Sequence, residues 1–552
     1  MLEFVFPLVP YLSFFSMLTS LILMLILSVF SSNDFRKQFG KIKKSTWLIL
    51  IAIVIFGFYN LSASPNIFTT LHDEYSFGRY AVSLLNGDAG FFESFIGYQI
   101  FMSFIFLILG PDLSIIYVIN TIFGALSIIL VFLVAHMLFG EEEAGLFASL
   151  LFALFPLNNI YFNTLECSAS VIFFSLLTIF YFLFYFKVKT SKSQFLAALS
   201  LAFAVFFRLE FIILPILFGF MVLLFDFSLK KYKSFKHWIP WIVLVILIIP
   251  AFLQVLWNIH PLLSEGKHIT FSNPDYGIFS LKALSENAGK LNLIFISDLF
   301  PPYFVILLFL GLLSLFMKSK KRFIFIVAWI SVLMGIYLSY WILWLRHLLP
   351  VYMAVIIIWG GGASFVVDIF KKFVHKFLNI KFFNSWVILV VLLLLFVAAY
   401  PFAYSLEKKY PMFLFWGARE IYLEREALYF LDQTLGSCTI VMVDDEGLIS
   451  RDLKPLKIEH VIKNPEILEE TTKDGCLLYF EDLYCRVPSV FYTSMEELAG
   501  NYTRLCREMH EKFNLTVYKK FNITLPEAYE NFRPELIKND WAEFTLYNVS
   551  AG

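Results

Sequence analysis

Runs of about 20 apolar residues recur along the first 400 residues, and they constrain the fold more than any other feature. A helix needs about 20 apolar residues to cross the hydrocarbon core of a bilayer. The mean hydropathy of +0.75 and the hydrophobic content of 59% agree with this pattern. We therefore predict a polytopic α-helical membrane protein and exclude an ordinary water-soluble one.

About twelve crossings are expected. They lie at about 8–30, 46–62, 113–139, 145–160, 166–186, 194–206, 210–226, 238–257, 302–317, 323–342, 347–366 and 386–404. The first loop carries five basic residues, namely Arg36, Lys37, Lys41, Lys43 and Lys44. By the positive-inside rule this loop is cytoplasmic. Both termini and the segment after the second span are then expected outside.

The apolar run 95–110 is expected not to cross. A full crossing would place every later lysine-rich loop outside, against the positive-inside rule. The run is also short, at about 16 residues. We predict a helix that lies in the external interface or re-enters the membrane.

The charge balance changes near residue 410. Residues from 411 onward hold 15 Lys/Arg and 24 Asp/Glu, against 28 and 19 before that point. We predict a transmembrane catalytic domain, 1–410, and a small extracytoplasmic α/β domain, 411–552. Its expected elements are strands at Cys438–Val443, Cys476–Phe480, Leu515–Tyr518 and Phe544–Tyr547, and a helix at Ser494–Phe513.

The tail also contains four cysteines, Cys438, Cys476, Cys485 and Cys506, which allow three disulfide connectivities. Four glycosylation sequons, at Asn501, Asn514, Asn522 and Asn548, agree with an external location.

An acidic pair, Asp73-Glu74, follows the second span directly. An ionisable pair at a membrane boundary is costly and by default indicates a functional site. The same external side is expected to hold Glu166, Arg208 and the pair Arg346-His347. Plainer interpretations are that the acids begin a solvated helix, that Glu166 caps a span, and that Arg208 pairs with Glu210 or with lipid headgroups.

The pattern Asp73-Glu74-x₅-Tyr80-x₆-Gly87-Asp88 after an early span resembles the first external loop of GT-C class membrane glycosyltransferases. The most similar subgroup is the superfamily of dolichyl-phosphate-mannose protein mannosyltransferases and aminoarabinose transferases. Further features follow in the same order along about 46–410. They are Leu109-Gly110, Leu138-Phe139-Gly140, Leu154-Phe155-Pro156 and then the acidic Glu166.

This resemblance implies inverting transfer of a sugar from a polyprenyl (dolichyl) phosphate donor to an acceptor hydroxyl on the external or luminal face. The transfer needs a base for the acceptor proton, and the resemblance assigns this role to Asp73, with Glu74 beside it. The leaving phosphate needs a cation, for which Arg208 and Arg346-His347 or a divalent metal are candidates. Glu166 is the candidate metal ligand.

Three departures bear on the donor and acceptor. Gly97-Tyr98-Gln99 stands where the family often has Lys-Pro-Pro, Glu166 stands where Asp is frequent, and the span 8–30 is additional. The Trp-Trp-Asp motif of oligosaccharyltransferases is absent from the sequence. That absence argues against transfer of a whole oligosaccharide to asparagine.

Two other functions remain open: a transporter or flippase of lipid-linked sugars, and a receptor whose tail binds a ligand. The lysine-rich loops are topology signals rather than nucleic-acid sites. The expected partners are the membrane, the lipid-linked donor, and a glycan, protein or lipid acceptor. Residue usage favours a prokaryotic plasma membrane over the endoplasmic reticulum. The sequence does not identify the sugar, the acceptor or the oligomeric state.

Overall fold

The structure is a computed structural model of the 552-residue chain. It describes residues 8–63, 73–87, 96–111, 113–162, 167–226, 234–265, 281–285, 287–288, 301, 303–339, 345–378, 383–409, 439–442, 454–464, 477–481, 485, 496–522 and 543–551. The chain forms two compact units, each described here by itself. One combines Met1–Pro65 with Ser83–Glu407, and the other combines Asn66–Val82 with Lys408–Gly552. The domain boundary expected at 410/411 stays a prediction.

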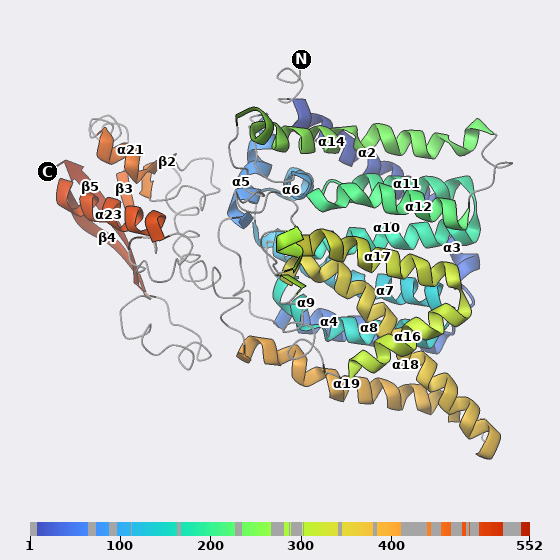
Figure 1. Ribbon diagram of the computed structural model, residues 1–552. Coiled ribbons are helices and arrows are strands. Elements are labelled where there is room, and N and C mark those ends of the chain that lie inside the picture. Colours follow the sequence, from blue (N-terminus) through green and yellow to red (C-terminus); the bar gives the residue numbers. More distant parts are fainter. Residues whose placement is uncertain are drawn as a thin grey trace. The chain divides into compact units, whose positions relative to one another are not determined.

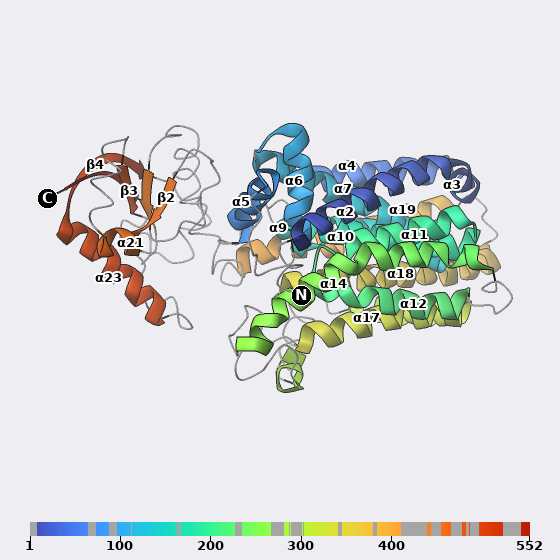
Figure 2. The ribbon, with the colours of Figure 1, turned by 90° about the horizontal axis from the view of Figure 1, so that it is seen from above.

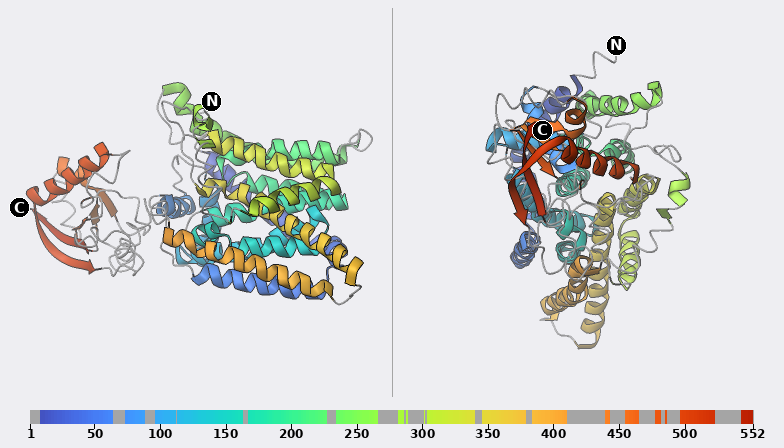
Figure 3. Two further views of the ribbon diagram at one scale, coloured as in Figure 1. Left: turned by 60° about the horizontal axis from the view of Figure 1, so that its bottom comes forward. Right: turned by 90° about the vertical axis from the view of Figure 1, so that its left-hand side faces the viewer.

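The first unit is a bundle of long helices that run side by side (Figures 1 and 3). Its elements are α2 (Val9–Phe30), α3 (Ser32–Phe39), α4 (Lys44–Ala63), the end of α5 (Asp73–Leu85), α6 (Gly97–Leu109), α7 (Leu113–Phe139), α8 (Glu142–Ala153), α9 (Pro156–Tyr161), α10 (Ser168–Val188), α11 (Ser191–Ala204), η2 (Leu209–Ile213), α12 (Leu214–Phe225), η3 (Phe235–His237), α14 (Ile239–Glu265), α16 (Phe304–Lys318), α17 (Lys320–Ser339), η4 (Leu345–Leu348), α18 (Leu349–Leu378) and α19 (Phe383–Lys409). The predicted polytopic helical fold is confirmed.

Among the described residues, seven helices are long and apolar enough to cross a membrane. They are Val9–Phe30, Lys44–Ser62, Ile115–Phe139, Ser168–Val188, Ile239–Leu256, Lys320–Ser339 and Leu349–Phe373. Four shorter apolar helices accompany them: Gly97–Leu109, Phe211–Phe225, Phe304–Lys318 and Val387–Pro401. The chain is a multi-pass membrane protein, and the count of twelve crossings stays a prediction.

Two of the long helices, α10 and α18, lie in the bundle interior, whereas α2 exposes most of its side chains. Glycines allow α16 and α18 to approach closely. A Cβ added at Gly362 would lie 2.1 Å from the carbonyl oxygen of Leu307, and one added at Gly311 would lie 2.1 Å from that of Ile358. Small residues permit such backbone contact between membrane helices. Gly311 and Gly362 therefore serve close helix packing.

The short helix α6 lies crosswise to the long helices at one end of the bundle (Figures 1 and 2). Its 13 residues rise only about 20 Å, which is too short for a crossing. Its placement agrees with the predicted interfacial or re-entrant helix. We call this end of the bundle, which also holds η2 and η4, the α6 end; the sequence predicts it to be external.

Two expected boundaries are wrong. The span predicted over 145–160 is two helices, because α8 ends at Ala153 and Pro156 begins α9. Proline favours the first position of a new helix, where its missing N–H costs nothing. The loop predicted from 258 starts later, because α14 continues to Glu265.

The acidic turn 141–143 lies at the opposite end of the bundle, where it binds three other helices. Glu141 forms an ion pair with Lys318 and accepts a hydrogen bond of 2.6 Å from the Ser364 hydroxyl. Glu142 accepts a hydrogen bond from the Thr46 hydroxyl. These contacts explain two of the three acidic residues in a region of basic loops.

The second unit contains a five-stranded sheet in the order β2-β1-β3-β5-β4. Its elements are β1 (Thr439–Met442), β2 (Lys454–Lys457), α21 (Ile458–Lys463), β3 (Leu477–Glu481), α23 (Glu496–Lys512), β4 (Phe513–Asn522) and β5 (Glu543–Ala551). The first three strands are parallel, and β5 is antiparallel to both β3 and β4. The expected small α/β fold is confirmed, with β2 and α21 as elements that the sequence analysis missed.

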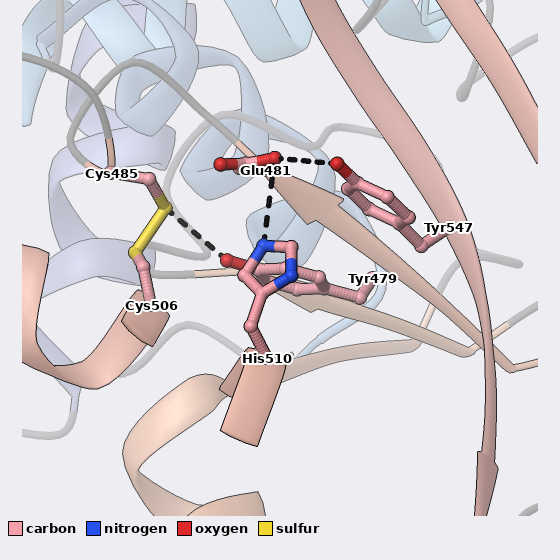
Figure 4. The surroundings of a disulfide bond; sticks show 6 residues. All are labelled: Tyr479, Glu481, Cys485, Cys506, His510 and Tyr547. Atoms are coloured by element: carbon pink, nitrogen blue, oxygen red, sulfur yellow. Dashed lines mark hydrogen bonds and ion pairs between the residues drawn. A yellow bond between two sulfur atoms is a disulfide. The ribbon is translucent and has the colours of Figure 1, made fainter. Parts of the chain in front are cut away.

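A disulfide joins Cys485 to Cys506 of α23, with 5.5 Å between the Cα atoms. Beside it, the Tyr547 hydroxyl donates a hydrogen bond of 3.0 Å to Glu481, and His510 Nε2 lies 3.8 Å from the same carboxylate oxygen (Figure 4). The other two tail cysteines, 438 and 476, lie outside the described residues.

Candidate functional site

The predicted acidic pair begins helix α5. Asp73 and Glu74 occupy its first turn, and their side chains lie outside the described residues. Acidic residues at this position favour the helix, because its N-terminus carries partial positive charge. The second half of α5 has a buried stripe that contains Tyr80, Ala81 and Leu84.

The position of Asp73 is in register with this stripe. Successive residues of an α-helix are about 100° apart, so positions 73, 80 and 84 fall on one face. Position 74 lies about a quarter-turn away, in register with Ala81, which is also buried. Both positions therefore continue faces of α5 that are buried further along the helix, and the backbone does not distinguish the two acids.

Helix α5 ends against the first helix of the bundle. The Tyr11 hydroxyl on α2 donates a hydrogen bond of 2.8 Å to the carbonyl oxygen of Gly87. The positive φ of Gly87, 78°, suits glycine and ends the helix there. The additional leading span thus contacts the residues that directly follow α5, a contact that sequence reasoning missed.

Arg208 lies in a short extended link at the α6 end of the bundle. Its backbone (φ −148°, ψ 144°) connects the end of α11 to η2, and its side chain is half-buried. Backbone hydrogen bonds hold both sides of this link. Phe207 N–H donates to the Ala204 carbonyl at 3.1 Å, and Phe211 N–H donates to the Arg208 carbonyl at 3.0 Å.

Arg346 and His347 lie on η4, directly before the long helix α18. The His347 ring is half-buried and nearly parallel to that of Tyr337 on α17, with 6.1 Å between centroids. Tyr337 itself is fully buried. The side chain of Arg346 lies outside the described residues.

A small apolar cavity lies close to the segments that carry these cations. Its enclosed volume is about 10 Å³, room for about one water molecule, and the total rises to about 330 Å³ when the space open to solvent is included. The lining residues are Ser175 and Ile179 of α10, Phe211 of η2, Leu214, Leu217 and Phe218 of α12, Phe325, Trp329 and Leu333 of α17, and Pro350 of α18. Phe211 lies three residues after Arg208, and Pro350 lies three residues after His347. The cavity therefore runs from the α6 end toward the middle of the bundle.

The metal prediction has no support from the described part of the chain. No group of three or more His, Cys, Asp or Glu side chains that could hold an ion occurs there. Glu166, the expected ligand, lies outside the described residues.

Comparison with known proteins agrees with the resemblance seen in the sequence. Residues 96–257 match the family profile described as dolichyl-phosphate-mannose-protein mannosyltransferase. This segment contains α6 and Arg208, and it begins after Asp73. No curated protein sequence matches the chain.

Two solved structures share the fold. The Archaeoglobus fulgidus oligosaccharyltransferase, tethered with an acceptor peptide containing the NVT sequon via a disulfide bond, is 13% identical with a TM-score of 0.50. That match covers 87% of this chain and 74% of the other. ArnT from Cupriavidus metallidurans bound to undecaprenyl phosphate is 14% identical with a TM-score of 0.53, covering 92% of this chain and all of the other. The predicted GT-C class fold is confirmed.

Proposed function

We propose that this protein is a glycosyltransferase that moves a sugar from a polyprenyl (dolichyl) phosphate donor to an acceptor hydroxyl, with inversion, on the external or luminal face. The partial match to the mannosyltransferase profile and the GT-C fold support this class of reaction. The binding of undecaprenyl phosphate by ArnT supports a donor with a long isoprenoid chain.

One observation carries the proposal: a small apolar cavity, open to solvent, lies close to the two segments that hold Arg208 and Arg346-His347. A polyprenyl phosphate has the matching chemistry, an anionic head at the membrane boundary and a hydrocarbon tail in the membrane. Helix α18 begins two residues after His347, and a helix N-terminus adds positive potential. Arginine is well suited to bind phosphate oxygens in pairs.

The reaction assigns one task to each group. The acceptor hydroxyl oxygen attacks the anomeric carbon from the face opposite the phosphate and passes its proton to the Asp73 carboxylate. The bond between the anomeric carbon and the phosphate oxygen breaks, and its electron pair leaves with the lipid phosphate. Arg208 and Arg346 stabilise the growing negative charge, with His347 as a hydrogen-bond donor.

We assign the base role to Asp73, the first acid of the pair, because the resemblance to the first external loop of GT-C glycosyltransferases gives that acid this role. Glu74, a quarter-turn away, is assigned an orienting role. A divalent metal with Glu166 as a ligand stays a prediction from the sequence, and no step of this proposal depends on it.

Two observations restrict the class of acceptor. The oligosaccharyltransferase with the related fold is tethered with a peptide acceptor, but this chain has no Trp-Trp-Asp motif. We therefore assign a hydroxyl acceptor, on a protein, glycan or lipid, rather than an asparagine amide. The site faces outward from a plasma membrane of prokaryotic type.

The test is transfer of labelled mannose from dolichyl-phosphate mannose in membranes that contain the full chain. Asp73→Asn is expected to lower turnover by about 10²–10⁴-fold, the usual contribution of a general base. Glu74→Gln is the matched control and is expected to lose much less. Normal turnover by Asp73→Asn would refute the assigned role. Movement of labelled donor across vesicles without any transfer would instead favour a transporter.

A further inference from the structure

The first turn of α6 packs directly on the segment that leads to Arg208. A Cβ added at Gly97 would lie 2.0 Å from the carbonyl oxygen of Phe206 and 2.3 Å from its carbonyl carbon. Both are backbone atoms, so they cannot be displaced by a side-chain rotation. Only glycine fits at position 97 without moving α6 away from Phe206, two residues before Arg208.

One turn further along α6, the ring of Phe101 packs on the same segment. Gly97 and Phe101 are four residues apart and share one face of the helix. The Phe101 ring lies 5.9 Å from that of Phe207, and Phe207 also stacks on Phe174 at 5.0 Å. Helix α6 therefore contacts both residues that precede Arg208, one by its backbone and one by its side chain.

The crosswise position of α6 is in turn fixed by a buried hydrogen-bond chain. Asn120 Nδ2 on α7 donates to the Tyr98 hydroxyl at 3.0 Å, and the Ser170 hydroxyl on α10 donates to Asn120 Oδ1 at 3.2 Å. Asn120 and Ser170 are fully buried and Tyr98 is nearly so. Hydrogen bonds of this kind fix geometry in a low-dielectric interior, where misplacement of a polar group is costly.

We infer that Gly97 and Tyr98 are positioning residues that set the location of Arg208 for the donor phosphate. This inference rests on the proposed function. It gives a specific purpose to the tripeptide Gly97-Tyr98-Gln99: glycine allows close backbone contact, and tyrosine supplies the hydroxyl that anchors α6 to α7 and α10.

The experiment compares binding of undecaprenyl phosphate with binding of undecaprenol, which has the same tail and no phosphate. Gly97→Ala is expected to weaken binding of the phosphate about tenfold, the scale of one charged hydrogen bond, and to leave undecaprenol unchanged. Gly219→Ala is the matched control, because a Cβ at this helical glycine of α12 meets nothing within 4 Å. It is expected to leave both affinities unchanged.

Tyr98→Phe provides a milder variant should Gly97→Ala fail to fold. It removes only the hydroxyl that accepts from Asn120 and is expected to shift phosphate binding in the same direction. Its control is Tyr181→Phe, which removes a buried hydrogen bond of 2.8 Å to Ser28 elsewhere in the bundle. That control is expected to change thermal stability alone.

Combination with Arg208→Gln separates the possible results. If Gly97 acts through Arg208, the double variant binds undecaprenyl phosphate as Arg208→Gln does. If the losses of phosphate affinity caused by Gly97→Ala and Arg208→Gln add fully in the double variant, the inference is wrong. It is also wrong if Gly97→Ala weakens the binding of undecaprenyl phosphate and of undecaprenol equally. If Arg208→Gln loses phosphate binding while Gly97→Ala and Tyr98→Phe both keep it, the inference about Gly97 and Tyr98 is wrong. The donor role of Arg208 then still stands. Normal phosphate binding by Arg208→Gln would overturn the donor role of Arg208 and the inference with it.

Discussion

The Nζ atom of Lys371 lies 3.0 Å from Oε1 of Glu143, which ties the start of α8 to the last turns of α18. Both side chains are about one-fifth exposed. Burial alone would raise the pKa of Glu143, but a hydrogen bond from its own backbone N–H and the hydrogen bond and charge of the Lys371 ammonium outweigh burial. The pKa of Glu143 therefore lies below its ordinary value.

A carboxylate whose pKa is lower in the folded than in the unfolded protein stabilises the folded state above the unfolded-state pKa, near 4.5. This stabilisation is lost as the pH falls through the pKa of the group in the folded protein. Lys371→Gln is expected to destabilise the protein by about 1 kcal/mol at pH 7. The difference from wild type should shrink as pH falls from 4.5 through the lowered pKa of Glu143, because the carboxylate then becomes protonated in both proteins. Thermal unfolding in detergent at several pH values measures this. Lys372→Gln, an exposed neighbour, is the control, and a pH-independent difference would contradict the assignment.

Arg208 is expected to recognise phosphate by geometry as well as by charge. Arg208→Lys retains the charge but loses the planar fork that binds two oxygens, and should weaken binding of undecaprenyl phosphate about tenfold. Arg208→Gln should weaken it about a hundredfold. Equilibrium binding in detergent measures both. Equal affinities for Arg208→Lys and wild type would show that only the charge matters. Lys236→Gln, at an exposed position of η3, is the control.

The apolar cavity is expected to make the KM for the donor depend on the length of its isoprenoid tail. Leu333→Phe narrows the cavity and should raise the KM for a long polyprenyl donor roughly fivefold, since buried tail area is lost. A donor with only two isoprene units should be affected less. Val327→Phe, on a partly exposed position of the same helix, is the matched control. The same rise in KM for both donors would argue against a tail site.

The Cys485–Cys506 disulfide is expected to stabilise the second unit. Its loop of about 21 residues corresponds to roughly 3 kcal/mol in the chain-entropy account. The double variant Cys485→Ser/Cys506→Ser should make the tail of the full chain much more sensitive to protease. Cys167→Ser, in the other unit, is the control. If the protease resistance of the tail is unchanged after the double substitution, the hydrophobic core of the second unit is sufficient to keep it folded without the disulfide.

The two tail cysteines outside the described residues are expected to form the second bond. With Cys485 joined to Cys506, only one of the three connectivities remains for the set of four. The residues that follow them, Thr439 and Leu477, are register partners on the parallel strands β1 and β3. Mass spectrometry of non-reduced peptides should find Cys438 linked to Cys476, and free thiols at both would contradict this.

The membrane part of the fold could be predicted because its signal is local. An apolar run of span length has few alternatives to a helix, and the expected spans are found as helices. The break between α8 and α9 was missed because apolar residues continue on both sides of Pro156. Strand β2 was missed because Lys-Pro-Leu-Lys has neither the length nor the composition of a strand. The proline of β2 is tolerated because this strand lies at the edge of the sheet, where proline removes no hydrogen bond between strands.

The candidate site was predictable in part. Charged residues stand out against an apolar background, so Asp73, Arg208 and Arg346 could be proposed from position alone. The contact between Gly97 and Phe206 could not, because it joins residues 109 positions apart and no local pattern signals it. The cavity is likewise a product of three-dimensional packing between α10, α12 and α17.

The order of strands in the tail has a consequence for biosynthesis. Strand β5 comes last along the chain, yet it lies between β3 and β4 in the sheet. During synthesis, β4 therefore has no sheet neighbour until residues 543–551 have emerged. A ribosome that stops before Glu543 leaves an unpaired ten-residue edge, which quality-control proteases and chaperones can recognise.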